Sequence, residues 1–153
     1  VIIGRTLGRG DKDLAYKYSI KMMKLTFIFN IFTMTLLIIA IWPIAGIYGF
    51  EPETTDMLIK SLLVFAAAQL PKMLVYVLIC GIIRAGGDTV WCLIAEFIFN
   101  FCIQIALAFL AVNILGLPLY LSIAVVMVAE LLKSIICIRR VLSKKWMNVF
   151  TGR

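Results

Sequence analysis

The stretch Gly81-Ile82-Ile83-Arg84-Ala85-Gly86-Gly87-Asp88-Thr89 separates two long apolar segments and decides how the chain folds. Apolar runs lie on both sides of it, at 57–83 and at 90–115. Glycine at 86 and 87 lets the chain reverse within very few residues, because glycine carries no Cβ that would clash in a tight turn. The sequence therefore predicts a helical hairpin, with Asp88 or Thr89 capping the second helix through a side-chain oxygen.

The composition is that of a membrane protein. Hydrophobic residues make up 63% of the 153 residues and the mean hydropathy is +1.07, whereas a soluble domain is roughly 45–50% apolar. A helix needs about 20 mostly apolar residues to cross a hydrocarbon core about 30 Å thick, and it satisfies its backbone hydrogen bonds internally. We predict an all-α polytopic membrane protein with four transmembrane helices, at 25–49, 57–83, 90–115 and 117–138.

The charged residues lie mainly in the connections and near the ends. The net charge is +7, and basic residues concentrate in 1–24, which we interpret as the end of a truncated helix plus an amphipathic lead-in, and in the tail 139–153. The connection after the first span is acidic instead. This is the positive-inside pattern, which predicts that the 84–89 turn and both ends lie in the cytoplasm. We expect a multi-pass protein of the plasma membrane. Nucleic-acid binding is not expected, because it needs basic residues on a water-exposed face.

Three polar residues interrupt the third span at a regular spacing. Glu96, Asn100 and Gln104 stand at i, i+4 and i+8, which puts them on one stripe of a helix. Polar groups inside a bilayer must be paired or solvated. Two interpretations follow: the three side chains hold neighbouring helices together, or they line a hydrated path in which Glu96 is a proton or cation site.

The second span carries Gln69, Pro71 and Lys72 near its middle. Proline removes a backbone donor, so we expect a kink, either for packing alone or at a substrate or ion site, as in the interrupted helices of transporters. Lys72 precedes Arg84 by 12 residues, a distance of roughly 18 Å along a helix. At that depth its charge faces a cavity or an acidic partner, or it snorkels along its own stem.

The fourth span contains Glu130 and Lys133 at a spacing of i, i+3, which allows an ion pair on one face. Helical rise places Glu130 and Glu96 at similar depths, each roughly 12–14 Å from the cytoplasmic end. We expect a structural pair with Lys133 snorkelling toward the cytoplasmic interface, and we retain Glu130 as a candidate for the transport pathway.

Nothing in the sequence indicates catalysis. The chain has no histidine, so a histidine-dependent base or metal site is excluded. Its cysteines lie in apolar segments without the close spacing of a zinc or redox site, and no phosphate-binding glycine loop or paired nucleophile and base occurs. We expect no enzyme activity, no resident cofactor and no metal site. The cysteines are Cys80, Cys92, Cys102 and Cys137.

Several segments resemble one family in order and spacing. The 81–89 stretch resembles the Gly-x-x-Arg-x-x-Gly-Asp-Thr signature of multidrug and toxic compound extrusion (MATE) transporters, and it contains the matching Gly81, Arg84, Gly87, Asp88 and Thr89. Gly4-Arg5-Thr6-Leu7-Gly8-Arg9-Gly10-Asp11 is similar to the family's Gly-Gln-x-Leu-Gly-Ala-Gly segment, with Arg5 where glutamine is frequent. Gln69-Leu70-Pro71 is similar to the element before the signature helix. Glu130-x-x-Lys133 and Ser143-Lys144-Lys145-Trp146 resemble the tail of many bacterial members.

The resemblance implies a fragment of a twelve-helix transporter with two six-helix lobes. The chain would supply the end of helix eight and helices nine to twelve of the second lobe, and the opening Val1-Ile2-Ile3 without methionine agrees with a longer chain. The implied function is efflux of amphipathic, often cationic compounds in exchange for Na⁺ or H⁺ by alternating access. The implied partners are the lipid bilayer, small-molecule drugs or metabolites, and the missing N-terminal part.

One family feature does not carry over. Some members have an ion-site aspartate in the tenth helix, whereas this chain has no acidic residue between Asp56 and Asp88. The coupling ion therefore stays open, and Glu96 is a candidate from its own position only.

Two alternative functions are also compatible with the sequence. A lipid-linked oligosaccharide flippase of the same superfamily would need a more cationic cavity, toward which Lys72 would contribute. A free-standing four-helix scaffold or channel subunit would need self-association to bury Lys72, Glu96 and Glu130.

Overall fold

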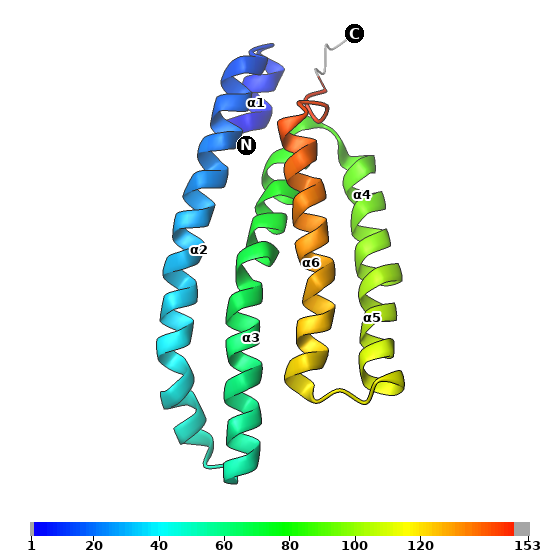
Figure 1. The fold of residues 1–153 in the computed structure, drawn as a ribbon. Coiled ribbons are helices and arrows are strands. Elements are labelled where there is room, and N and C mark those ends of the chain that lie inside the picture. Colours follow the sequence, from blue (N-terminus) through cyan, green and yellow to red (C-terminus); the bar gives the residue numbers. More distant parts are fainter. Residues whose placement is uncertain (1, 149–153) are drawn as a thin grey trace.

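The chain forms helical rods joined by short reversals, as the computed structural model of residues 2–148 shows (Figure 1). Val1 and residues 149–153, the end of the predicted basic tail, lie outside the described residues. The elements are α1 (Ile2–Gly8), α2 (Lys12–Tyr48), α3 (Pro52–Tyr76), the π-helix η1 (Val77–Ile83), the 3₁₀ turn η2 (Arg84–Gly86), α4 (Thr89–Phe97), the π-helix η3 (Ile98–Gln104), α5 (Ile105–Phe109), the π-helix η4 (Leu110–Ile114) and α6 (Leu119–Leu142).

Four helical rods within the described residues are long and apolar enough to cross a membrane. This confirms the predicted all-α polytopic fold with four transmembrane helices. The segment that we interpreted as a lead-in is continuous with the first rod, because α2 runs without a break from Lys12, where the Asp11 carboxylate accepts a hydrogen bond from the Leu14 amide at 3.0 Å. The rods are α2, α3 with η1 and η2 (Pro52–Gly86), α4 through η4 (Thr89–Ile114), and α6.

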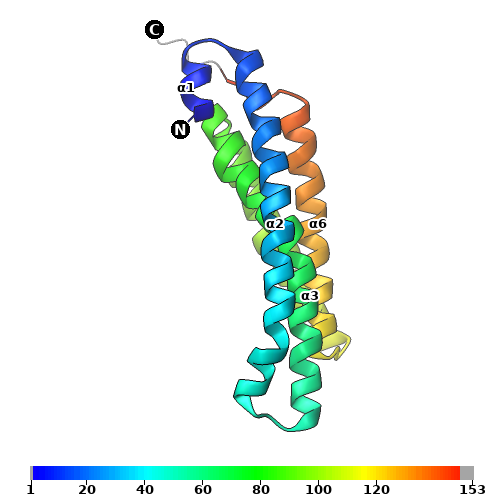
Figure 2. The same ribbon diagram turned by 90° about the vertical axis from the view of Figure 1, so that its left-hand side faces the viewer.

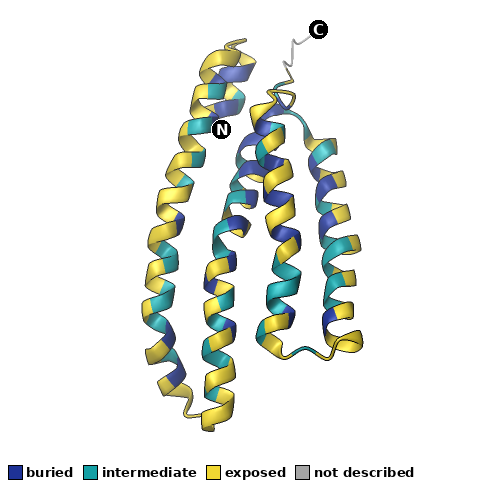
Figure 3. Ribbon diagram, viewed as in Figure 1, coloured by how far each residue is buried: buried dark blue, intermediate teal, exposed yellow. Residues whose placement is uncertain are grey.

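The third-span rod is not packed against α2, and α3 stands between the two halves of the bundle. Helix α3 packs against α2 on one side and α6 on the other, and η3 and α5 pack against α6 (Figures 1 and 2). Figure 3 shows exposed residues along the outer faces of all four rods. In a bilayer such apolar surface contacts lipid or neighbouring helices.

The largest buried apolar cluster described lies at the end of the bundle that carries Arg84, Arg139, Arg140 and Lys144, which we call the basic end. There α1, η1, α4 and α6 share one apolar cluster, and Trp146 lies fully buried in it. The Trp146 indole donates to the Val141 carbonyl at 3.0 Å, and the Asn148 amide donates to the Gly86 carbonyl at 3.0 Å. The segment after α6 thus covers the turn of the signature stretch.

The two turn glycines are needed for different reasons. Gly87 has a φ of +88°, in the left-handed region that side-chain-bearing residues rarely adopt. A Cβ on Gly86 would overlap the ring and carbonyl oxygen of Trp146. Gly81, by contrast, has room for a Cβ, whose nearest neighbour would be Val77 Cγ1 at 3.6 Å.

The predicted cap of the third span is wrong. Asp88 occupies the N-cap position of α4, but its side chain makes no capping hydrogen bond within the described residues, and the exposed Thr89 is the first residue of the helix. The Asp88 carboxylate instead accepts from Arg140 Nε at 2.8 Å and pairs with Nη2 at 2.6 Å. Both guanidinium nitrogens bind the same oxygen, Oδ2, so the carboxylate pairs with α6 instead of capping α4. Arg140 also stacks on Trp91, 5.3 Å from the ring centroid.

Helix α3 continues through its internal proline. Pro71 is buried inside α3, and six residues later, at Val77, the helix widens into η1. The rod changes direction along its length in Figure 2. The lost backbone donor of proline and the π-helical turns are both recognised causes of such bending, and π-helical turns are frequent at functional sites.

Replacing Gly86 with alanine should destabilise the basic end. We expect the Gly86→Ala change to lower the free energy of unfolding of the full-length protein by about 1–3 kcal/mol, because the Trp146 ring must move. Denaturant unfolding followed by helical circular dichroism measures the effect. Gly46→Ala is the control, since a Cβ there has no neighbour within 4 Å and alanine favours a helix. Equal stability of Gly86→Ala and the natural protein would contradict this packing argument.

Candidate functional site

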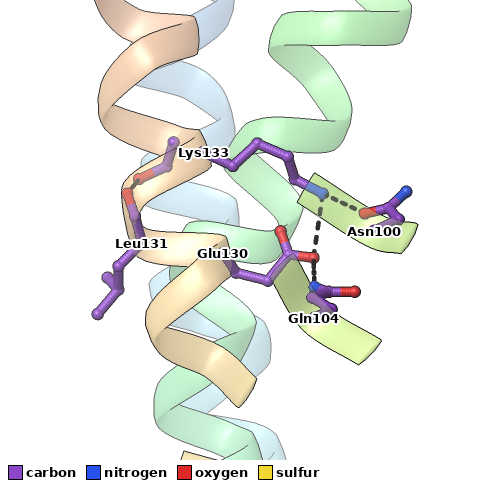
Figure 4. A network of polar contacts seen from close by, with 6 residues as sticks. Asn100, Gln104, Glu130, Leu131 and Lys133 are labelled. Atoms are coloured by element: carbon purple, nitrogen blue, oxygen red, sulfur yellow. Dashed lines mark hydrogen bonds and ion pairs between the residues drawn. The ribbon is translucent and has the colours of Figure 1, made fainter. Parts of the chain in front are cut away.

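Four polar side chains meet inside the bundle, where η3 faces α6 (Figure 4). The Lys133 ammonium donates to Asn100 Oδ1 at 2.9 Å and to Glu130 Oε1 at 3.1 Å. The Gln104 side-chain amide donates to the same Glu130 oxygen at 2.6 Å. Two residues from each helix therefore form one hydrogen-bonded network, which we call the charged cluster (Asn100, Gln104, Glu130 and Lys133).

The cluster follows directly from residue spacing on each helix. Asn100 and Gln104 are four residues apart on η3, and Glu130 and Lys133 are three apart on α6. Both spacings put the side chains on a common face. The packing of η3 against α6 then brings the two faces together.

Both charged members of the cluster are buried. Glu130 is 6% exposed and Lys133 is 5% exposed. Removing two charges from water is costly unless hydrogen bonds satisfy them, and here the two amides supply the additional contacts. The expected snorkelling of Lys133 is therefore wrong: its ammonium has two oxygen acceptors inside the bundle and stays there.

The cluster borders a cavity of about 360 Å³ that also collects Lys72 and Glu96. Five of the six transport candidates from the sequence, namely Lys72, Glu96, Asn100, Gln104 and Glu130, thus line one cavity between α3, the third rod and α6. Asn100 and Gln104 bond across to α6, as the helix-packing interpretation of the polar stripe expects. Glu96 turns the other way, and its Oε2 pairs with Arg84 Nη2 at 2.7 Å.

Lys72 does not extend toward the basic end. Its ammonium lies 5.5 Å from the centroid of the Phe65 ring, which is seven residues nearer the start of α3. Helical side chains lean toward the N-terminus of their helix. For Lys72 this direction points away from the basic end of the bundle. Within residues 2–148 no carboxylate forms an ion pair with Lys72.

Gln69, the sixth candidate, lies apart from the cavity. It lines a separate hollow of about 410 Å³ between α2 and α3. Asn30 lines the same hollow, and its side-chain amide donates to the Leu70 carbonyl at 3.0 Å and the Gln69 carbonyl at 3.4 Å. Asn30 is 3% exposed and was not among the residues singled out from the sequence, although an amide inside the apolar run 25–49 is a visible signal.

The signature residues lie at the basic end rather than in the cavity. Gly86, Gly87 and Asp88 build the turn there, and Arg84 alone connects the signature to the cavity through Glu96. Within residues 2–148 no group of three or more histidine, cysteine or acidic side chains is placed to hold a metal ion.

A bundle of membrane-spanning helices with ionisable groups facing an open cavity between the helices is typical of membrane transport proteins. The comparison with protein families agrees: the MatE family matches residues 1–110, from α1 into η4, and includes the whole signature stretch. Because the match covers most of the 153 residues, the chain belongs to the MatE family, the multidrug and toxic compound extrusion transporters. Neither the comparison with curated proteins nor that with solved structures gives a match.

Removing one charge of the buried Glu130–Lys133 pair should lower the free energy of unfolding more than removing both charges does. Lys133→Met leaves Glu130 without its counter-charge, so we expect a loss of about 3–5 kcal/mol in the free energy of unfolding. The double variant Lys133→Met with Glu130→Gln should recover much of that loss, because no uncompensated charge remains. Unfolding of the full-length protein in mixed micelles measures this cycle.

The matched control is the exposed pair Lys60–Asp56, which lies on α3 away from the cavity. Exposed pairs contribute little, so removing this pair should leave stability unchanged. If the losses of the two single variants at Lys133 and Glu130 simply add in the double variant, the two groups are not coupled.

Proposed function

We propose that this chain forms part of the second lobe of a secondary transporter that exports amphipathic compounds by alternating access, in exchange for H⁺ or Na⁺. Family membership supports a transporter, and the observation that carries the ion-coupled mechanism is the buried Glu130–Lys133 pair. A charge pair is expensive inside a bilayer and is typically retained for function.

Glu130 is the residue to which we assign ion coupling. Its Oε1 accepts from Lys133 on its own helix and from Gln104 on η3, so its charge holds the two rods together. Neutralising that carboxylate would weaken both contacts and let η3 move relative to α6. The other charged groups that line the cavity are Lys72 from α3 and Glu96 from α4.

The contacts around Glu130 disfavour a metal cation as the coupling ion. The Oε1 atom of Glu130 is approached by two N–H donors, from Lys133 and Gln104. A hard metal cation takes several oxygen ligands, and N–H donors at the same oxygen oppose that arrangement. Protonation needs only one oxygen and no coordination shell.

Glu96 plays a different part in this proposal. Its partner Arg84 belongs to the signature turn, and the exposure of both side chains, 44% for Arg84 and 33% for Glu96, indicates contact with the surroundings. We assign the Arg84–Glu96 pair to closing the cavity at the basic end. The positive-inside pattern supports placing that end, and both chain ends, on the cytoplasmic side of the plasma membrane.

Transport by the complete protein tests the assignment of Glu130. Proteoliposomes are loaded with two permanently charged pyrene probes, a pyrenebutyl sulfonate and a pyrenebutyl trimethylammonium, and efflux is followed after imposing a pH or Na⁺ gradient. We expect a gradient to accelerate efflux of at least one probe. Glu130→Gln should abolish that acceleration because the side chain no longer gains or loses a proton, while gradient-free exchange of the probe continues.

The control is Glu53→Gln, the same chemical change in the first turn of α3. It should leave the gradient-driven acceleration of efflux intact. If Glu96→Gln abolishes it and Glu130→Gln does not, the coupling group is Glu96. If no gradient accelerates either probe in the natural protein, ion-coupled export is wrong.

A further inference from the structure

The cavity beside the charged cluster carries one positive charge that no described side chain balances. The carboxylates of Glu96 and Glu130 each have a cationic partner, Arg84 at 2.7 Å and Lys133 at 3.1 Å. Lys72 lines the same cavity, and no ion pair involves it within residues 2–148. Its ammonium has only the face of Phe65, at 5.5 Å.

The cavity wall also offers hydrogen-bond donors. Asn100 uses its oxygen on Lys133, so its NH₂ group is left without a partner among the described residues. The Lys133 ammonium has three N–H bonds and uses two of them, on Asn100 and Glu130. Tyr76, a further lining residue, can donate its hydroxyl hydrogen.

An ammonium at this depth is stabilised by an anion, and Lys72 is exposed in the structure and therefore accessible to one. Lys72 lies roughly 18 Å along the helix from Arg84, and an unpaired charge inside a bilayer is strongly unfavourable. The rest of the cavity wall is apolar and includes Val75, Ile79, Val126 and Met127. An anion that suits both features has an acidic group attached to an apolar body.

We propose that this cavity binds the acidic group of an amphiphile, with Lys72 as its anchoring charge and Asn100 as a hydrogen-bond donor. The group is a sulfonate, phosphate or carboxylate, whose oxygens accept from both side chains. The inference rests on the proposed export function and names a substrate class for it: amphiphiles bearing a negative charge. The two sources of such a group are an anionic lipid and a soluble amphiphilic cargo.

Binding to the complete transporter in nanodiscs tests the proposal with the two pyrene probes of opposite charge. We expect Lys72→Met to weaken binding of the sulfonate about tenfold or more, the loss expected for one charge-assisted hydrogen bond. Lys72→Arg should preserve that binding because it keeps the charge. The trimethylammonium probe should bind Lys72→Met at least as well as the natural protein.

The matched control is Lys60→Met, the same change at an exposed lysine of α3 whose partner is Asp56, and it should leave sulfonate binding unchanged. Nanodiscs of phosphatidylcholine alone, compared with nanodiscs that also contain phosphatidylglycerol, separate the two sources. If phosphatidylglycerol competes with the sulfonate probe, the bound anion is a lipid. If phosphatidylglycerol does not compete, the bound anion is a soluble cargo. Either result supports an anion site.

Equal sulfonate binding by Lys72→Met and the natural protein overturns the proposal. An equal loss of sulfonate binding in Lys72→Met and Lys72→Arg also overturns the proposal, because the positive charge would then not determine binding. Failure here is distinguishable from failure of the export function, because the binding measurement uses no gradient, whereas export is tested separately by gradient-accelerated efflux of either probe and its loss in Glu130→Gln.

Discussion

Polar groups in a bilayer interior must find their partners within the protein, and this constraint governs the whole structure. Backbone groups meet it by forming continuous helical rods. The few ionisable side chains meet it by pairing across rods, as Glu130 and Lys133 do with the two amides of η3. The position of η3 against α6 is thus fixed by a requirement for partners rather than by hydrophobic attraction, which is weak between helices in lipid.

The same constraint explains why the structure is dense at one end and open elsewhere. At the basic end, α1, η1, α4 and α6 enclose an apolar cluster, and two arginines are each bound to a carboxylate. Farther along, the rods diverge around the two hollows and expose mostly apolar surface. One end of the bundle holds the buried apolar cluster, and the two hollows lie next to it.

Much of the fold was predictable because membrane spans depend on local composition. Length and hydropathy alone identify the four rods, and the spacing of Asn100 and Gln104 places them on one face. Partners far apart in the sequence were not predictable. Asp88 bonds to Arg140 instead of its own helix end, and Lys133 stays inside because two oxygens are within reach. Glu96 shares the stripe of Asn100 but bonds to Arg84, because it lies one turn nearer the signature reversal.

The position of Trp146 has a consequence for the order in which the chain is assembled. Gly86 belongs to the turn between the second and third rods. The Trp146 indole that covers it and the Asn148 backbone amide that donates to its carbonyl follow the last rod in the sequence. During synthesis the Gly86 turn therefore precedes α4 through α6, and neither the Trp146 indole nor the Asn148 amide can cover it until α6 has been made. Trp146 therefore packs against Gly86 only after α6 is complete, and this late contact fixes the last hairpin against the signature turn.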